Sequence, residues 1–592
     1  MADSKNKKAR LRSQAWFDNA DDIGMTAMYL ERYFNFGLTP EELRSGRPII
    51  GIAQSGSELS PCNYIHTQIV DRIRDGIRDG GGIPLVFPVH PIHEQGRRPT
   101  AALDRNLAYL GLVEILHGYP FDGVVLTTGC DKTTPAMIMA ATTVDIPAIV
   151  LSGGPMLDAY WRGKLAGSGT THWEARKQHA TGELDDDGYF DMTVAQAPST
   201  GHCNSMGTAL TMNSLAETLG LSLKGCATIP APYSARAAMA YRTGKASVGM
   251  VNEDLRPTKI LTRKAIENAI AMNTLLGGST NAQVHITAIA RHAGVDIAVK
   301  DWETHGHDLP LLVNMQPAGE YLGEAFHRAG GVPAVLWELN QAGKLHADCL
   351  TCDGGTIGSR VEETRDRRVI LPYQSPLKTQ AGFIVLSGNL FDSAILKTSV
   401  IDADFSKRFL EHPDHPGVFE GRAIVFEGSE DYHGRINDAS LEIDETCILV
   451  MRQAGPVGWP GSAEVVNMQP TDELLKSGIR SLPTMGDGRQ SGTSGSPSIL
   501  HVTPESAIGG NLALLQTNDI VRVDIPARRV DVLLGDEELA ARRESWVPEL
   551  LENQTPWQQI YRNNVGPLST GACFDFAVEY AAAGDKIPRH NH

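Results

Sequence analysis

Residues 123–135 read GVVLTTGCDKTTP, and the rest of the chain is organised around this stretch. Its first six residues form a short apolar run rich in valine and threonine, which is typical of a β-strand. A thiol, a carboxylate and an amine follow at once: Cys130, Asp131 and Lys132. Ligands bind open α/β sheets beyond the carboxyl ends of the strands, so this position favours a functional site. The alternative is a buried core cysteine followed by an aspartate at a helix start.

The same stretch continues into a helix and belongs to a repeating pattern. Residues 136–143 have a helical pattern, with Thr133 or Thr134 as the expected N-cap and Pro135 in the first turn. Further strands are predicted at residues 49–54, 83–88 and 148–152, and further helices at 65–78, 101–117, 206–219 and 281–293. Strands alternating with helices of this length predict βαβ units, and hence a mostly parallel sheet covered on both faces.

The sequence pattern changes after residue 380, from alternating strands and helices to short strands with few helices between them. Short strands separated by turns rich in Gly, Asp and Pro are predicted at residues 383–386, 422–426, 447–451, 520–524 and 530–534. We therefore predict an α/β protein with two domains. Residues 1–380 form the parallel-sheet domain, with residues 1–46 as an N-terminal arm, and 381–592 form a β-rich, barrel-like domain. Residues 154–200 are predicted to be an irregular, polar excursion of a kind that compact domains keep for function.

Composition excludes several classes of protein. The 592 residues are 42% hydrophobic and 21% charged, which is typical of a globular protein too long for a single core. A net charge of −17 argues against binding to nucleic acid. No apolar run is long enough to span a bilayer, and the basic N-terminus lacks the apolar segment of a signal peptide. Eight cysteines are too sparse for a disulfide framework, so we predict a cytoplasmic protein.

Three cysteines lie in loops flanked by Gly, Pro or Asn. Cys62 and Cys130 both follow predicted strands of the parallel sheet, and Cys203 directly precedes a predicted helix. A helix start favours the thiolate form of a cysteine. Three thiolates suit iron–sulfur ligation with one iron position left open, and an open iron can act as a Lewis acid. The alternative is that all three are ordinary core cysteines.

A second cysteine pattern competes with this interpretation. Cys349 and Cys352 form a C-x-x-C pair near the predicted domain junction, a spacing found in redox and metal sites. No second pair lies at zinc-finger spacing, and we interpret the pair as incidental. The remaining cysteines lie in apolar surroundings and are predicted to be core residues: Cys226, Cys447 and Cys573.

Oxygen ligands and a possible base lie in other loops. Glu94 follows a predicted strand, Asp131 follows another, and Glu464 stands in a Gly/Pro/Trp-rich loop of the second domain. Carboxylates of this kind suit Mg²⁺, although an isolated glutamate is more often a solvated surface charge. Residues 486–493 read GDGRQSGT, a Gly-rich turn that presents Ser491 and Thr493. It suits a nucleophile or base held near a ligand, or else a polar β-turn.

Together these segments resemble the dihydroxy-acid/phosphogluconate dehydratase family. The resemblance covers nearly the whole chain in order, and within it residues 490–498 resemble the sugar-acid branch, whose members dehydrate pentonates such as D-xylonate or L-arabinonate. The motifs that carry it are PCN at 61–63, GCDKTTP at 129–135, GHCN at 201–204, GGSTN at 277–281 and GDGRQSG at 486–492.

The resemblance implies a set of cofactors and roles. It implies a [2Fe–2S] cluster on Cys62, Cys130 and Cys203, a site between the two domains and a homodimer or homotetramer. It also implies Mg²⁺ on Glu94, Asp131, Glu464 and a carbamylated Lys132, and a Ser491 alkoxide as the base, with Thr493 as the next candidate.

The reaction implied is loss of water across C2 and C3 of a small sugar acid, giving a 2-keto-3-deoxy acid. Two alternatives within the family are a phosphogluconate and a branched-chain dihydroxy-acid dehydratase. Outside it, the same cysteines could serve a non-catalytic iron–sulfur sensor, and Cys349 and Cys352 could serve a thiol oxidoreductase. A further hypothesis is that the C-terminal residues 588–592, which include His592, contact substrate hydroxyls; a frayed tail is the alternative.

Overall fold

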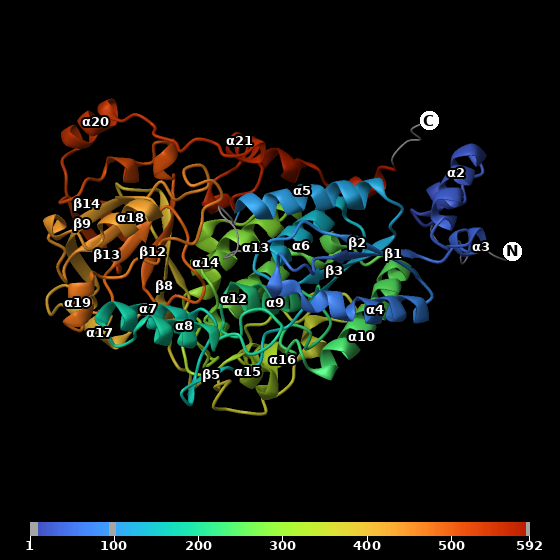
Figure 1. Cartoon of the computed structure of the whole chain (residues 1–592), viewed down its shortest axis with the longest axis horizontal. Coiled ribbons are helices and arrows are strands. Elements are labelled where there is room, and N and C mark those ends of the chain that lie inside the picture. Colours follow the sequence, from blue (N-terminus) through green and yellow to red (C-terminus); the bar gives the residue numbers. More distant parts are fainter. Residues whose placement is uncertain (1–9, 94–101, 588–592) are drawn as a thin grey trace.

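The structure is a computed structural model and describes residues 10–93 and 102–587. It has two lobes, one on each side of a group of central helices (Figure 1). The first lobe is built on a four-stranded sheet and the second on an eight-stranded sheet. The predicted combination of a parallel-sheet α/β domain and a barrel-like domain is therefore confirmed. The position of the boundary, near residue 380, stays a prediction.

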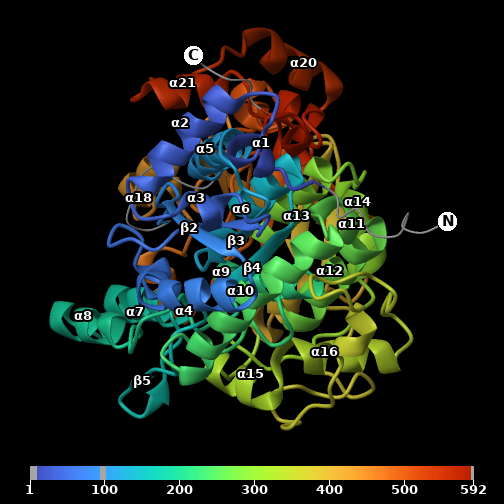
Figure 2. The same ribbon diagram turned by 90° about the vertical axis from the view of Figure 1, so that its right-hand side faces the viewer.

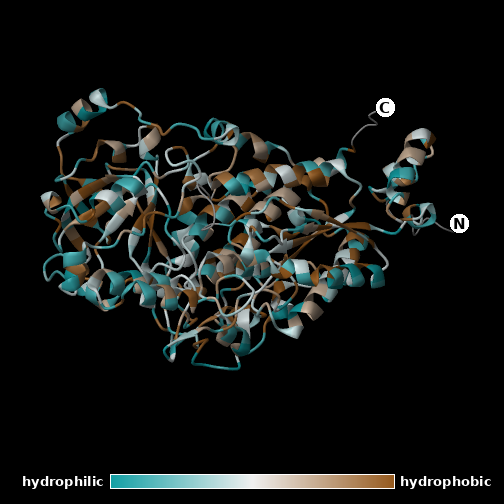
Figure 3. Cartoon of the chain, in the orientation of Figure 1, coloured by the Kyte–Doolittle hydropathy of each residue, from teal (hydrophilic) through white to brown (hydrophobic). Residues whose placement is uncertain are grey.

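The first sheet is parallel throughout, with strand order β2-β1-β3-β4. Its strands have the predicted bounds: β1 Ile49–Gln54, β2 Ile83–Pro88, β3 Gly123–Thr128 and β4 Ala148–Ser152. Every residue of β3 and β4 is buried. Helices on both faces exclude water from these strands, and this explains why they are continuous apolar runs rather than alternating ones. In Figure 3 the sheet is mostly brown, whereas α20 on the outside of the molecule is mostly teal.

Two pairs of helices cover this sheet. α5 (Ala102–Gly118) and α6 (Thr133–Val144) lie on one face, and α4 (Ile65–Asp79) and α10 (Ser234–Glu253) on the other (Figures 1 and 2). α4 and α10 cross in backbone contact, because a Cβ atom at Gly76 would lie 2.0 Å from the Tyr241 carbonyl oxygen and one at Gly244 2.2 Å from that of Ile73. These glycines therefore fix how closely the two helices approach.

The start of α6 differs from the prediction. The helix begins at Thr133, Lys132 occupies the N-cap position without a side-chain cap, and Pro135 is the third helical residue. The predicted capping by Thr133 or Thr134 is wrong, because Thr133 Oγ1 instead donates to the Cys130 carbonyl oxygen at 2.8 Å. This bond closes the turn that carries Cys130.

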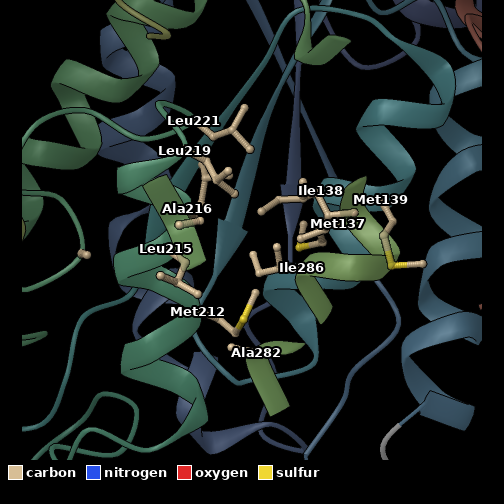
Figure 4. Close-up of a cluster of buried hydrophobic side chains, with 14 of the residues drawn as sticks. Met137, Ile138, Met139, Met212, Leu215, Ala216, Leu219, Leu221, Ala282 and Ile286 are labelled. Atoms are coloured by element: carbon tan, nitrogen blue, oxygen red, sulfur yellow. The ribbon is translucent and has the colours of Figure 1, made fainter. Parts of the chain in front are cut away.

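Helices between the lobes form a continuous core. α9 (Thr208–Thr218) is buried along its whole length, as is α6. A helix that is buried on all sides belongs to the interior rather than to a surface layer. Figure 4 shows how α6, α9 and α13 (Asn281–His292) meet through the side chains of Met137, Ile138, Met212, Leu215, Ala282 and Ile286. The other helices of this half are α11 Pro257–Ile260, α12 Arg263–Leu276, α14 Val299–Gly306, α15 Gly323–Ala329 and α16 Gly331–Gln341.

The segment 154–200 is more regular than predicted. It contains a short hairpin, β5 (Tyr160–Trp161) with β6 (Lys164–Leu165), followed by helices α7 (Thr170–Thr181) and α8 (Asp186–Val194). The prediction of an irregular excursion is wrong for the helical part. The polar composition of the segment suggested a loop, but it reflects helices on the outside of the lobe. α7 and α8 project from the first lobe, and α7 packs on α19 (Asp472–Lys476) of the second lobe (Figure 1).

The second sheet has the strand order β14-β13-β9-β10-β11-β12-β8-β7. Ser387, directly after β7, forms a single bridge with Arg529 at the start of β14, which nearly closes the sheet into a barrel. The five predicted strands are all present, β7 and β13 with the predicted bounds and the other three with adjusted bounds, and three strands were not predicted: β8, β11 and β12. The bounds are β7 Phe383–Leu386, β8 Ser393–Lys397, β9 Val418–Glu427, β10 Ile448–Arg452, β11 Thr484–Gly486, β12 Ser498–Thr503, β13 Ile520–Asp524 and β14 Arg529–Val532.

Both ends of the described chain pack on the first lobe. The arm is helical as predicted, with α1 Gln14–Phe17, α2 Ile23–Phe34 and α3 Pro40–Leu43. At the other end, α20 (Asp536–Ser545) and α21 (Pro556–Arg562) lead back from the barrel, and Trp557 Nε1 donates to the Leu103 carbonyl oxygen at 3.1 Å. Short helices α17 Ala403–Phe405 and α18 Ser429–Arg435 flank the barrel. Among the described residues, no helix is both long and apolar enough to cross a membrane.

Candidate active site

Side chains from both lobes line a small cavity of about 60 Å³. The first lobe contributes the loops that follow β1 and β3. The second contributes the loops that follow β10 and β11, two neighbouring parallel strands. The cavity therefore lies where the carboxyl ends of parallel strands from two sheets face one another. Its walls include most of the predicted site residues: Cys62, Cys130, Cys203, Asp131, Glu464, Ser491 and Thr493.

The three predicted thiols come together at one side of this cavity. Cys62 lies in a short 3₁₀ turn, Pro61–Asn63, and the next residue, Asn63, accepts the backbone N–H of Cys130 at 2.7 Å. Cys203 lies in the loop before α9 and accepts a hydrogen bond from Ser168 Oγ at 3.2 Å. Each thiol is thus held in a turn that other residues fix.

The pKa values of the thiols diverge. A hydrogen-bond interaction with the neighbouring Cys130 thiol lowers the pKa of Cys62 to about 6, against the effect of burial. The same hydrogen bond, together with burial, raises the pKa of Cys130 well above its usual value. Burial raises the pKa of Cys203 to about 12. Converging thiolates therefore repel one another unless a cation neutralises them, which is the chemistry of a metal-binding cysteine set.

Lys132 joins the carboxylates of the two lobes. Its amine is fully buried, forms an ion pair with Asp131 and lies 3.7 Å from Glu464 Oε1. Burial by itself would raise the pKa of Asp131, but the Lys132 ammonium lowers it. Arg489 Nη1 lies 3.4 Å from Glu464, and Asn281 Nδ2 also donates to that carboxylate. The two carboxylates, Asp131 and Glu464, therefore lie close together in a buried position beside the positively charged side chains of Lys132 and Arg489.

This donor set fits the metals that the resemblance implies. The thiols suit a soft metal, and Asp131 and Glu464 suit a hard cation. Carbamylation would make Lys132 a third anion, and three anions in a buried position require a cation. Within residues 10–93 and 102–587, no three His, Cys, Asp or Glu side chains already form a metal-ion site. Glu94, the remaining predicted ligand, lies outside the described residues.

The predicted Ser/Thr turn reaches the cavity from the second lobe. Ser491 Oγ lies 2.8 Å from Thr493 Oγ1, and the Thr493 backbone N–H donates to Ser491 Oγ at 3.3 Å. Asn467 Oδ1 accepts the Ser491 backbone N–H at 3.0 Å. A backbone N–H of this turn thus points at the serine oxygen. The turn can therefore stabilise negative charge on that oxygen.

Some residues of the site had no assigned role in the sequence analysis. Asn281, at the start of α13, donates to Glu464 and to the Gln490 carbonyl oxygen and so links the two lobes. The GGSTN motif at residues 277–281 marks Asn281 as part of a special turn, but it does not indicate which residues Asn281 binds. His93 lines the cavity, and Trp173 of α7 donates to Thr493. Neither could be found by pattern, because both act through contacts between distant segments.

The other predicted candidates lie elsewhere. Cys349 and Cys352 are buried away from the cavity, and burial raises the pKa of Cys352 to about 12, so neither has the character of a reactive thiol. Cys226, Cys447 and Cys573 are buried as predicted. The C-terminal residues 588–592 lie outside the described residues.

Two larger cavities adjoin the site on different sides. One of about 500 Å³ shares Thr493 with it and is lined mainly by α7 and the β5–β6 hairpin. The other, of about 630 Å³, shares Cys62 and Cys203. The hydroxyl side and the thiol side of the site thus border separate cavities.

Comparison with known proteins gives matches over nearly the whole chain. Residues 47–360 match the model for the dihydroxy-acid/6-phosphogluconate dehydratase N-terminal domain, and residues 368–572 match that for the C-terminal domain. D-xylonate dehydratase of Caulobacter vibrioides is 62% identical over 591 residues, covering 100% of this chain and 99% of the relative.

More distant relatives span the chain equally well. L-arabinonate dehydratase of Rhizobium leguminosarum bv. trifolii is 41% identical over 586 residues, covering 98% of each chain. Dihydroxy-acid dehydratase of Caldanaerobacter subterraneus subsp. tengcongensis is 36% identical over 552 residues, covering 91% of this chain and 96% of the relative.

Proposed function

The chain belongs to the dihydroxy-acid/6-phosphogluconate dehydratase family and is a hydro-lyase, and we propose that its substrate is a five-carbon sugar acid such as D-xylonate or L-arabinonate. It removes water across C2 and C3 and yields a 2-keto-3-deoxy acid. The observation that carries this proposal is the convergence of three thiols, two carboxylates and Ser491 on one cavity between the lobes. The 62% identity to a D-xylonate dehydratase over the full chain favours the sugar-acid branch.

The proposed cofactors are a [2Fe–2S] cluster and Mg²⁺. Dehydratases of this family are generally metal-dependent. Cys62, Cys130 and Cys203 would hold the cluster; the ligands of Mg²⁺ would be Asp131, Glu464, a carbamylated Lys132 and Glu94. When bound, these metals supply Lewis acidity that stabilises charge on the substrate oxygens and assists departure of hydroxide.

The residues of the second lobe handle the proton. Ser491 takes the proton from C2, the C2–H electron pair becomes the C2–C3 double bond, and hydroxide leaves C3. The resulting enol tautomerises to the 2-keto acid. A serine hydroxyl is a weak acid, so its alkoxide needs donors nearby. The Thr493 backbone N–H and hydroxyl, 3.3 Å and 2.8 Å from Ser491 Oγ, are placed to serve as those donors.

The proposed assembly is a homodimer or homotetramer. α2 projects from the first lobe (Figure 1) and exposes apolar side chains, with Ile23 74% exposed and Phe34 58% exposed. Burial of such side chains against another copy of the chain would stabilise an oligomer. The cytoplasmic location stays a prediction.

A dehydration screen tests the proposal. The purified protein is given C5 and C6 aldonic acids, 6-phosphogluconate and a branched-chain dihydroxy acid, and keto-acid formation is measured. We expect the highest kcat/KM with a pentonate. Preference for the phosphorylated or the branched acid would assign the chain to another branch of the family. Absence of turnover with every acid by protein that carries both metals would favour the iron–sulfur sensor.

A further inference from the structure

Trp173 connects the projecting helix α7 to the Ser/Thr turn. Its indole Nε1 donates to Thr493 Oγ1 at 3.1 Å, across the boundary between the two lobes. Thr493 Oγ1 is in turn 2.8 Å from Ser491 Oγ. A side chain of the first lobe therefore reaches the proposed base of the second lobe through one intervening hydroxyl.

The direction of these hydrogen bonds is constrained. An indole N–H can only donate, so Thr493 Oγ1 must accept from Trp173 and still carries its own proton. Once Ser491 has lost its proton it can only accept. The Thr493 hydroxyl is then the donor to the Ser491 oxygen, alongside the Thr493 backbone N–H at 3.3 Å. Trp173 holds the threonine oxygen where this donation needs no rotation of the side chain.

Packing leaves Thr493 little alternative. A Cβ atom at Gly169 would lie 2.5 Å from Thr493 Oγ1, and one at Gly207 would lie 2.9 Å from its Cγ2 atom. Both glycines thus leave a slot that the threonine fills. A β-branched side chain in such a slot keeps one rotamer, which orients its hydroxyl.

The helix that carries Trp173 is itself anchored to the second lobe. Glu174 forms an ion pair with Arg480 at 2.6 Å, and Gln469 Nε2 donates to the Trp173 carbonyl oxygen at 3.3 Å. These bonds hold α7 against the barrel without help from the indole. A change confined to the indole can therefore test its hydrogen bond while the helix stays docked.

We propose that Trp173 is a positioning residue for proton removal, acting through Thr493 on Ser491. The proposal rests on the assignment of Ser491 as the base in the proposed function. It gives the polar segment 154–200 a role in the reaction, because α7 completes the donor arrangement that the Gly-rich turn begins.

The first test is Trp173→Phe, which keeps an aromatic ring and removes the N–H donor. We expect kcat to fall roughly three- to tenfold, the scale of one lost neutral hydrogen bond, with KM unchanged. The pH at which kcat reaches half its maximum should rise, and the isotope effect with C2-deuterated substrate should increase. Trp161→Phe is the control, because Trp161 lines the same 500 Å³ cavity and stacks under Arg162 instead. It should leave kcat, KM, the pH profile and the isotope effect unchanged.

The second test separates positioning from packing. Thr493→Val removes the intervening hydroxyl, with an expected loss in kcat of roughly 10- to 100-fold. Trp173→Phe should then cost nothing further in the Thr493→Val background, because its effect passes through that hydroxyl. Additive losses, or an unchanged pH profile and isotope effect in Trp173→Phe, would overturn the proposal. Ser491→Ala distinguishes failure of the Trp173 proposal from failure of the proposed function. If this variant retains more than about a tenth of the wild-type kcat, the assignment of Ser491 as the base fails as well.

Discussion

Both lobes place their functional side chains in loops after parallel strands, but these loops differ in length and in the contacts that hold them. In the first lobe, Cys130 and Asp131 lie within three residues of the end of β3, a fully buried strand, and the side chains of Asn63 and Thr133 close the short turn that carries them. In the second lobe, Glu464 and Ser491 lie farther along loops after β10 and β11. Side chains hold those loops, chiefly Asn281 and Asn467. The first lobe therefore suits ligation of the cluster, and the second lobe supplies the proposed base and one proposed ligand of Mg²⁺.

The difference implies that substitutions in the two lobes should fail in different ways. Loss of a first-lobe thiol removes a ligand and with it the cluster. Loss of Ser491 should leave the metals in place and lower the rate, and loss of Glu464 or of its partner Asn281 should weaken Mg²⁺ binding while the cluster stays in place. The predictions that follow test this contrast, beginning with the largest expected effect.

Cys130→Ser should abolish activity and the brown colour expected of an iron–sulfur protein, because a serine oxygen is a poor ligand for such a cluster. Cys62→Ser and Cys203→Ser should behave alike. Visible absorption and iron content are the measurements. Cys352→Ser is the matched control, since Cys352 is buried outside the cavity and should retain both colour and turnover. Full colour in any of the three site variants would remove that cysteine from the ligand set.

Ser491→Ala should lower kcat by about 10²–10⁴-fold while the visible spectrum and substrate binding persist, because it removes only the base. Exchange of the C2 hydrogen with deuterated solvent should disappear in parallel. Retention of exchange at the wild-type rate would mean that another group takes the proton. Loss of colour in this variant would contradict the separation of roles between the lobes.

Asn281→Ala should cost about 10- to 100-fold in activity at low Mg²⁺, the usual effect of losing a partner that orients a metal ligand. Asn281 binds both Glu464 and the Gln490 carbonyl oxygen, so the variant loosens the second lobe over the first. A titration with Mg²⁺ checks this, and high Mg²⁺ should restore part of the rate. A defect that no concentration of Mg²⁺ improves would assign Asn281 to substrate binding instead.

Glu464→Gln tests the proposed Mg²⁺ site directly, because a neutral amide is a poor ligand for a hard cation. Thermal stability and cluster absorption should stay near wild type while most turnover is lost. Unchanged turnover after exhaustive chelation of the wild-type protein would contradict the role of Mg²⁺ altogether.

The smallest expected effect concerns the brace of the Glu464 loop. Glu505 accepts the backbone N–H of Val457 at 2.9 Å and that of Gly458 at 3.0 Å. Burial raises the pKa of Glu505 from 4.5 to about 8, and the nearby Asp487 carboxylate adds to this rise. Between these two pH values the folded chain binds a proton that the unfolded chain does not, so this residue's contribution to stability is lost as the pH rises through 8.

Glu505→Gln should remove that pH dependence. Near pH 5 the variant and the wild type should melt at similar temperatures. At pH 9 the variant should melt higher by about 2–5 °C, the shift expected from one or two kcal/mol in a large domain. Parallel melting curves from pH 5 to 9 would show that Glu505 stays ionised in the fold.

Much of the first lobe could be predicted because its signals are local. The four strands have the predicted bounds, since buried parallel strands are short apolar runs closed by turn residues. The start of α6 was misassigned because Thr133 closes a turn with Cys130 instead of capping the helix. Helices α7 and α8 were missed because their residues are polar: α7 docks on the other lobe, as the ion pair of Glu174 with Arg480 illustrates, and α8 packs on α7.

The sequence by itself determined the kinds of chemistry available: three thiols and several carboxylates in turns after strands, and a serine in a Gly-rich loop. These follow from residue type and local pattern. The tertiary structure alone decided which of them meet. Lys132 lies between carboxylates from two lobes, and Trp173 reaches Thr493 from a segment 320 residues away in the chain. Such pairings depend on how two sheets pack on common helices, and no local pattern encodes that distance.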